Sequence, residues 1–180
     1  MKRKTFREWR IIADYAKNID ELDLKSMHRP LQVHGHETPS DLSKLTMGQM
    51  VILSQTKGDW SLFYTICREL LSMDEKETDM ADAVQIVMFC GWAIGKLEEL
   101  NKLLTSIKSP HTSEQLRAGV DKLNFGVFGL VDWYARRMGI SDHEEVMAVP
   151  VLRVYQCLKM DNEQQQYENR LAKILRETRK

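Results

Sequence analysis

Three of the chain's five histidines lie within nine residues, in the stretch MHRPLQVHGHETPSD. His28, His34 and His36 could supply three nitrogen ligands to zinc, and Glu37 or Asp41 could supply a fourth. Their spacing matches no helical or finger-type zinc motif, and no strand is predicted that would place His34 and His36 on one face. We therefore predict a linker that is stiffened by its prolines and binds no metal.

The other clusters of ionisable residues have structural explanations. The sequence DHEE follows Ser141, and Ser141 with Glu144 forms the pattern of a capping box at a helix start. Glu98 and Glu99 are adjacent, so on a helix they point about 100° apart and cannot share a substrate. The sequence contains no phosphate-binding loop, nucleophile elbow or dinucleotide fingerprint. It therefore predicts no enzyme, no cofactor and no small-molecule substrate.

The three cysteines indicate neither a disulfide framework nor a cysteine zinc site. Cys67, Cys90 and Cys157 are widely separated and lack a CxxC spacing, which fits a reducing, intracellular setting. The N-terminal sequence MKRKTFREW lacks the apolar segment of a secretory signal. The most apolar stretch, AVQIVMFCGWAIG, is too short to span a bilayer, so we expect a buried helix there and no membrane contact.

Apolar residues spaced three and four apart, with few prolines and no strictly alternating segment, predict an all-α fold. We expect a single helical bundle of about six helices with an N-terminal helical arm and a long C-terminal helix. The expected helices cover residues 5–17, 46–55, 59–73, 80–107, 112–138 and 150–177, with a short helix within 141–149. The charged stretch MDEKETD is expected to be a solvated turn.

Capping and turn residues set these boundaries. The expected caps are Thr46 with Gln49, Asp59, Thr112 with Gln115, and Gly139 in a left-handed C-terminal position. Pro30, Gly35 and Pro39 interrupt the chain near its first quarter, and Pro150 suits the first turn of the last helix. The predicted segments are an N-terminal arm and linker (1–39), a bundle core (40–160) and a C-terminal extension (161–180).

Charge is balanced over the whole chain but uneven along it. The 26 Lys and Arg equal the 26 Asp and Glu, whereas residues 1–10 and 169–180 each carry about +4 by formal count. Basic ends on an acidic body suggest contacts with other surfaces. Candidate contacts to DNA or an acidic surface are Lys2, Arg3, Lys4, Arg179 and Lys180.

The last helix changes character along its length. Its first half is apolar on one side, residues 161–166 are polar all round, and an apolar stripe resumes at Tyr167. A helix that leaves its own core and regains an apolar face either returns to the same bundle or meets another molecule. We expect a partner interface made by Phe6, Trp9, Arg10, Tyr167, Leu171, Ile174 and Arg176.

Two phrases resemble small helical proteins of tailed bacteriophages, including the crAss-like group. They are LTMGQMVILSQ and DWYARRMGISDHEEVMAVPVLRVYQCLKMDNEQQQYENRLAKI, which together cover roughly the last third of the chain and one earlier segment. The resemblance implies a virion component, and we expect a ring or adaptor subunit between portal and tail. The implied partners are copies of itself and portal or tail proteins, with nonspecific contact to packaged DNA. The implied location is the host cytoplasm during assembly and then the virion.

Two other classes of function are alternatives. A tail assembly chaperone would bind a tail protein transiently and be absent from mature particles. A small helical metal-dependent enzyme would need ligands that converge in space, with His34 and His36 as the first candidates.

Overall fold

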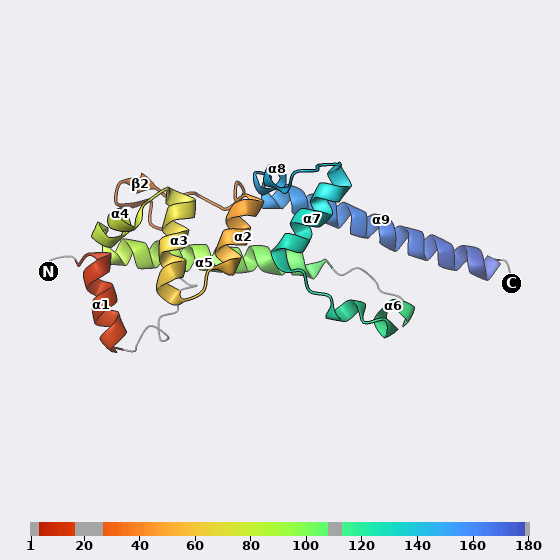
Figure 1. Ribbon diagram of the computed structural model, residues 1–180, viewed down its shortest axis with the longest axis horizontal. Helices are drawn as coiled ribbons and strands as arrows, with labels where there is room; N and C mark the ends of the chain where they lie inside the picture. Colours follow the sequence, from red (N-terminus) through yellow and green to blue (C-terminus); the bar gives the residue numbers. More distant parts are fainter. Residues whose placement is uncertain (1–3, 17–26, 108–112, 179–180) are drawn as a thin grey trace. The chain divides into compact units, whose positions relative to one another are not determined.

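The computed structural model in Figure 1 describes residues 4–16, 27–107 and 113–178. These ranges hold nine α-helices, a short 3-10 helix and one two-stranded hairpin, which confirms the all-α class. The elements are α1 (Phe6–Ala16), β1 (Gln32–Val33), β2 (His36–Glu37), α2 (Met47–Gln55), α3 (Asp59–Leu71), α4 (Glu75–Met80), α5 (Ala83–Ser106), α6 (Ser113–Arg117), η3 (Val120–Lys122), α7 (Gly126–Met138), α8 (His143–Met147) and α9 (Val151–Thr178).

The chain forms two compact units. Unit 1 consists of residues 1–42 and 52–100, and unit 2 consists of residues 43–51 and 101–180. This division differs from the predicted segments, because the N-terminal helix packs into unit 1 instead of standing apart as an arm. Helices α2 and α5 each contribute residues to both units.

In unit 1, the start of α1 pairs with the backbone that joins α4 to α5. The Phe6 amide donates to the Ala81 carbonyl at 2.8 Å, and the Ala83 amide donates to the Lys4 carbonyl at 3.1 Å. Phe6 itself is completely buried, with its ring stacked on Phe63 at 5.9 Å between centroids. Two strand-like hydrogen bonds and a buried ring therefore attach α1 to the rest of the unit.

The histidine segment forms an antiparallel hairpin, so the expectation of no strand was wrong. Val33 pairs with His36, and the two turn residues, His34 and Gly35, have φ of 50° and 86°. Positive φ at both central positions is the geometry of the tight hairpin turn that suits strand twist, and glycine adopts it at low cost. Val33 is fully buried and anchors the hairpin in unit 1.

The stretch MDEKETD is also more ordered than the expected solvated turn. Asp74 and Glu77 form a capping box in which each side chain accepts from the other residue's amide, at 2.7 and 3.0 Å. Thr78 is completely buried, with its hydroxyl donating to the Asp74 carbonyl at 2.8 Å. Helix α4 therefore belongs to unit 1 as a short, capped element.

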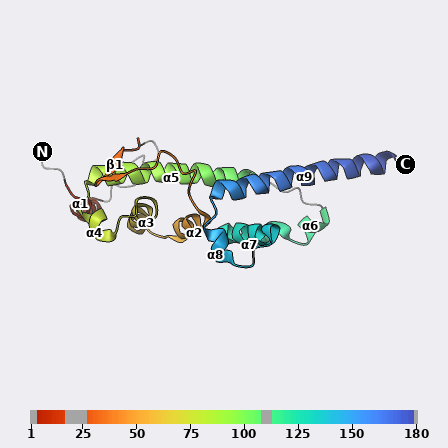
Figure 2. The same cartoon turned by 90° about the horizontal axis from the view of Figure 1, so that it is seen from above.

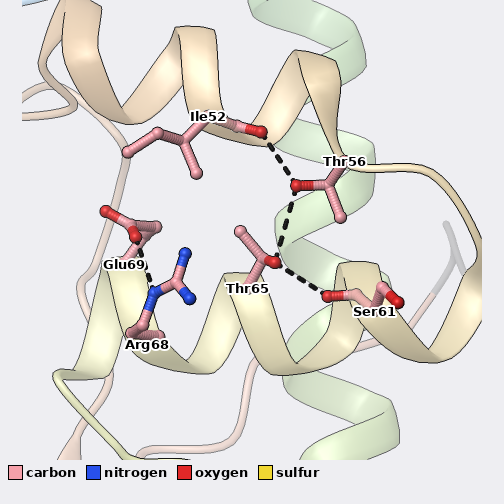
Figure 3. A network of polar contacts seen from close by, with 6 residues as sticks. All are labelled: Ile52, Thr56, Ser61, Thr65, Arg68 and Glu69. Atoms are coloured by element: carbon pink, nitrogen blue, oxygen red, sulfur yellow. Dashed lines mark hydrogen bonds and ion pairs between the residues drawn. The ribbon is translucent and has the colours of Figure 1, made fainter.

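Polar contacts join the end of α2 to α3, as Figure 3 shows. The Thr56 hydroxyl donates to the Ile52 carbonyl at 2.8 Å and lies 3.5 Å from the Thr65 hydroxyl, which donates to the Ser61 carbonyl. Helix α3 begins at Asp59, and Gly58 occupies the N-cap position that was expected for Asp59.

In unit 2, the capping box of Thr46 and Gln49 forms as expected. The Thr46 amide donates to Gln49 Oε1 at 3.1 Å, and the Gln49 amide donates to Thr46 Oγ1 at 3.3 Å. The same segment pairs with the start of α9, since the Val151 amide donates to the Leu45 carbonyl at 2.8 Å. A Cβ at Gly48 would lie 3.2 Å from the Met147 carbonyl oxygen, so glycine permits this close approach.

The expected helix over residues 112–138 is broken in the structure. Its pieces are α6, η3 and α7, and the breaks include Gly119 and Gly126 with φ of 83° and 56°. The predicted Thr112 cap lies outside the described residues. Gly139 ends α7 in the left-handed conformation, as expected. Asp142, and not Ser141, caps α8 by accepting from the Glu144 amide at 2.9 Å.

Replacing Phe6 by alanine should test the importance of the N-terminal contact. We expect a loss of about 3–5 kcal/mol in the free energy of unfolding, because the buried ring leaves a cavity. Urea denaturation followed by circular dichroism measures this loss. Ile11→Ala is the matched control on the same helix, because Ile11 is 50% exposed and its replacement should change stability by about 0.5 kcal/mol or less. Equal effects of both substitutions would contradict the assigned role of Phe6.

Candidate functional site

The three clustered histidines do not converge. His28 and His34 are exposed, and His36 is half-buried with Nε2 3.8 Å from Glu77 Oε1. The His34 backbone amide, rather than its ring, is oriented toward Gln85 at 3.5 Å. Within the described part of the chain, no group of three or more His, Cys, Asp or Glu residues is arranged to hold a metal ion.

Two of the cysteines are core residues of unit 1. Cys67 on α3 and Cys90 on α5 are both completely buried, with their sulfur atoms 4.0 Å apart. Burial is the main cause that raises the pKa of the Cys90 thiol, and the neighbouring Cys67 thiol raises it further. A buried thiol with a raised pKa is a poor nucleophile, so this pair serves packing.

A polar cluster joins three helices of unit 1. Arg10 on α1 donates to the Tyr64 hydroxyl on α3 at 2.8 Å, and that hydroxyl donates to Asp79 on α4. Burial, the hydrogen bond to Asp79 and the charge of Asp79 raise the pKa of Tyr64, in that order, while the Arg10 charge lowers it. Arg10, expected at a partner interface, is therefore engaged within its own chain.

The pKa shift of Tyr64 predicts a pH dependence of stability. The free phenol ionises near pH 10 in the unfolded chain, whereas the folded protein holds the neutral form to higher pH. The stabilisation is therefore complete below about pH 10 and declines as the pH rises further.

Tyr64→Phe should reveal this contribution. At pH 8 the variant should lose about 1–2 kcal/mol of stability, because two hydrogen bonds to the hydroxyl disappear. The difference from wild type should shrink between pH 8 and pH 11, as measured by urea denaturation at each pH. Tyr167→Phe, at an exposed position, is the control and should follow the wild-type curve. A constant difference across this pH range would contradict the assignment.

The N-terminal residues expected at an interface divide into buried and accessible ones. Phe6 is a core residue and is unavailable to a partner. Trp9 is half-buried, stacked on Phe6 at 6.1 Å and edge-on to Trp60 at 5.5 Å. Lys4 is exposed, while Lys2, Arg3, Arg179 and Lys180 lie outside the described residues. Of the N-terminal candidates that the structure describes, Trp9 and Lys4 offer a surface.

Trp9 contributes to an apolar hollow on unit 1. The hollow has a volume of about 180 Å³, and its lining is formed by Trp9, Met27, Ala83, Val84, Val87 and Met88. Val84 is 65% exposed although it belongs to the apolar stretch AVQIVMFCGWAIG that was expected to form a buried helix, and Met80 at the end of α4 is 60% exposed. Sequence periodicity missed this surface because it identifies an apolar stripe without identifying which part is covered.

The second half of α9 carries the C-terminal residues expected at an interface. Tyr167, Leu171 and Ile174 are 57%, 39% and 58% exposed, and Leu175 beside them is 51% exposed. Arg176 is exposed as well. Figure 1 and Figure 2 both show α9 continuing beyond α7 and α8 of the same unit. This half of the helix presents an apolar stripe that unit 2 leaves uncovered.

The first half of α9 is attached to unit 2 by buried valines and by an ion pair. Val151 and Val154 are completely buried, and Arg137 of α7 makes a bidentate pair with Asp161, with nitrogen–oxygen distances of 2.9 and 3.0 Å. This pair raises the pKa of Arg137 above its ordinary value, through the hydrogen bond to Asp161 first. The first half of α9 is therefore attached to the rest of unit 2 as far as Asp161, where the polar stretch begins.

Comparisons with protein-family models, curated proteins and solved structures find no match to this chain. None of the described helices combines the length and the apolar character needed to cross a membrane.

Proposed function

We propose that this chain is a structural component of a tailed-phage particle, a ring or adaptor subunit between portal and tail that acts through protein packing. The observation that carries the proposal is the uncovered apolar stripe of Tyr167, Leu171, Ile174 and Leu175 on α9. An extended helix with one apolar face is a common form of protein-binding surface.

The energetics of the stripe support a binding role. Burying a large apolar side chain is worth about 1.5–3 kcal/mol, so four such residues offer a substantial gain to a partner that covers them. Ordering of side chains and loss of translational freedom reduce that gain. A single contact of this size would give a low affinity. The same contact repeated among many copies would give a stable assembly.

The charge of this segment and the resemblance to phage proteins also support the proposal. The stripe is flanked by Arg170, Lys173 and Arg176 on a segment of net positive charge, which suits an acidic protein surface or packaged DNA. The segments that resemble phage proteins include the whole of α2 and all of α9 except its end. Neighbouring copies and portal or tail proteins are the partners that we propose.

The composition of purified particles tests the proposal. We expect quantitative mass spectrometry of gradient-purified virions from the encoding phage to find this chain at a fixed ratio to the portal protein. A soluble host-lysate fraction from the same infection is the control for carry-over. Abundance in the lysate with absence from the particles would contradict the proposal, and would favour the tail assembly chaperone.

A further inference from the structure

The apolar stripe on the second half of α9 has the spacing by which one helix packs along another. Its members are separated by four, three and four residues, namely Tyr167, Leu171, Ile174 and Thr178. Alternation of three and four residues is the heptad pattern of paired helices, in which such positions form the central seam. Leu175 borders the seam, and all five residues are exposed. A second helix is therefore the shape of partner that this stripe fits.

Contacts within unit 2 limit which part of α9 can meet a partner helix. Val154 is completely buried, and the Asp161 carboxylate is bound by Arg137 at 2.9 Å. From residue 167 to residue 178, in contrast, every residue of the helix is exposed. A partner helix must therefore pair with α9 beyond Asp161, where its own unit leaves it accessible.

Two copies of this segment can cover each other in antiparallel orientation. In one register, Leu171 of each copy lies beside Ile174 of the other, and Tyr167 of each lies beside Thr178 of the other. The two helices then overlap between Tyr167 and Thr178. The attached half of α9, which ends at Asp161, stays outside this overlap, so the pairing requires no change within unit 2.

The charges beside the stripe favour this register. In an antiparallel pair, each flank of the seam faces the same flank of the other helix. Arg170 of each copy then meets Glu177 of the other, which gives two pairs of opposite charge. On the second flank, Glu168 of each copy meets Leu175 of the other, so no like charges are brought together there.

Other arrangements of the two helices bring like charges together or meet buried residues. An antiparallel shift of one heptad toward unit 2 places Arg170 beside Arg170 and Glu168 beside Glu168 of the other copy. A shift of two heptads places Leu175 beside Val154, which is completely buried. In a parallel pair, Glu163 of each copy faces Glu168 of the other. Charge and burial together therefore select a single register.

From the spacing, the exposure and these charges we infer that two copies of the free protein pair through the second halves of α9 in antiparallel orientation. The same surface is used on both copies, so the contact closes at two copies and does not extend into a ring. It covers the stripe in the unassembled protein. The inference concerns the isolated chain and goes beyond the proposed function.

The size of the contact sets its strength. The overlap is about 18 Å long, because it contains about 12 residues of each helix. An interface of that length buries less than the roughly 1,200 Å² of a standard stable interface. We therefore expect a dissociation constant on the order of 0.1 mM, which allows the pair to separate when another partner binds the stripe.

A charge exchange in the full-length chain tests both the pairing and its register. Arg170→Glu places Glu beside Glu177 of the other copy, and Glu177→Arg places Arg beside Arg170, twice in each pair. Each variant alone should associate about tenfold more weakly than wild type. An equimolar mixture of the two should regain wild-type affinity, because each Glu then meets an Arg. Sedimentation equilibrium from about 10 μM to about 1 mM in low salt measures this, since salt screens exposed charges.

Two further variants separate the contact from effects of net charge and folding. Lys173→Glu makes the same charge change as Arg170→Glu, but at a position on the face of α9 away from the stripe. It should associate within about twofold of wild type. Ile174→Glu places a charge in the seam and should abolish pairing. All these positions are exposed, so each variant should retain the wild-type circular dichroism spectrum and urea midpoint.

Each other outcome overturns the inference. Wild type that stays monomeric up to about 1 mM lacks the contact, and species larger than two copies contradict a closed pair. Equal weakening by Arg170→Glu and Lys173→Glu excludes the flank contact, and a mixture that fails to regain affinity excludes the antiparallel register. The proposed function is tested separately, since the chain can be found in or missing from virions whichever way its free copies associate.

Discussion

The burial of Phe6 beneath the aromatic rings of α3, together with two backbone hydrogen bonds to the α4–α5 turn, determines how unit 1 is assembled. The bonds at Phe6 and Ala83 fix the start of α1 beside the start of α5. The Tyr64 hydroxyl then ties the middle of α1 to α4 through Arg10 and Asp79. Because the first helix is fixed in this way, Trp9 comes to line the hollow beside Val84.

Each unit buries its own core and also exposes large apolar side chains. In unit 1 these include Val84 at the hollow, and in unit 2 they include Phe125 and the second half of α9. Exposed apolar residues that lie next to one another indicate a binding surface more strongly than scattered ones do.

The phrase LTMGQ has a structural role that its residues explain. Thr46 and Gln49 cap α2, and Gly48 allows its backbone to approach the Met147 carbonyl more closely than a side chain would permit. The following pairing of Leu45 with Val151 fixes the start of α9. The segment around LTMGQ therefore specifies how the start of α2 meets α8 and α9.

Local spacing alone was enough to identify the features that depend on neighbours within a few residues. These include the long helices α5 and α9, the capping box at Thr46, the left-handed Gly139 and the stripe from Tyr167 to Ile174, since i to i+3 and i+4 contacts decide them. The hairpin at His34, the capping box of α4 and the break at Gly126 are also made by residues within a few positions of one another, and the sequence reading missed them because turn conformations and a second capping pattern were not recognised there. Tertiary structure decided the burial of Phe6 and the exposure of Val84. Those two features depend on residues distant in sequence, and periodicity shows that a face is apolar without showing whether another segment covers it.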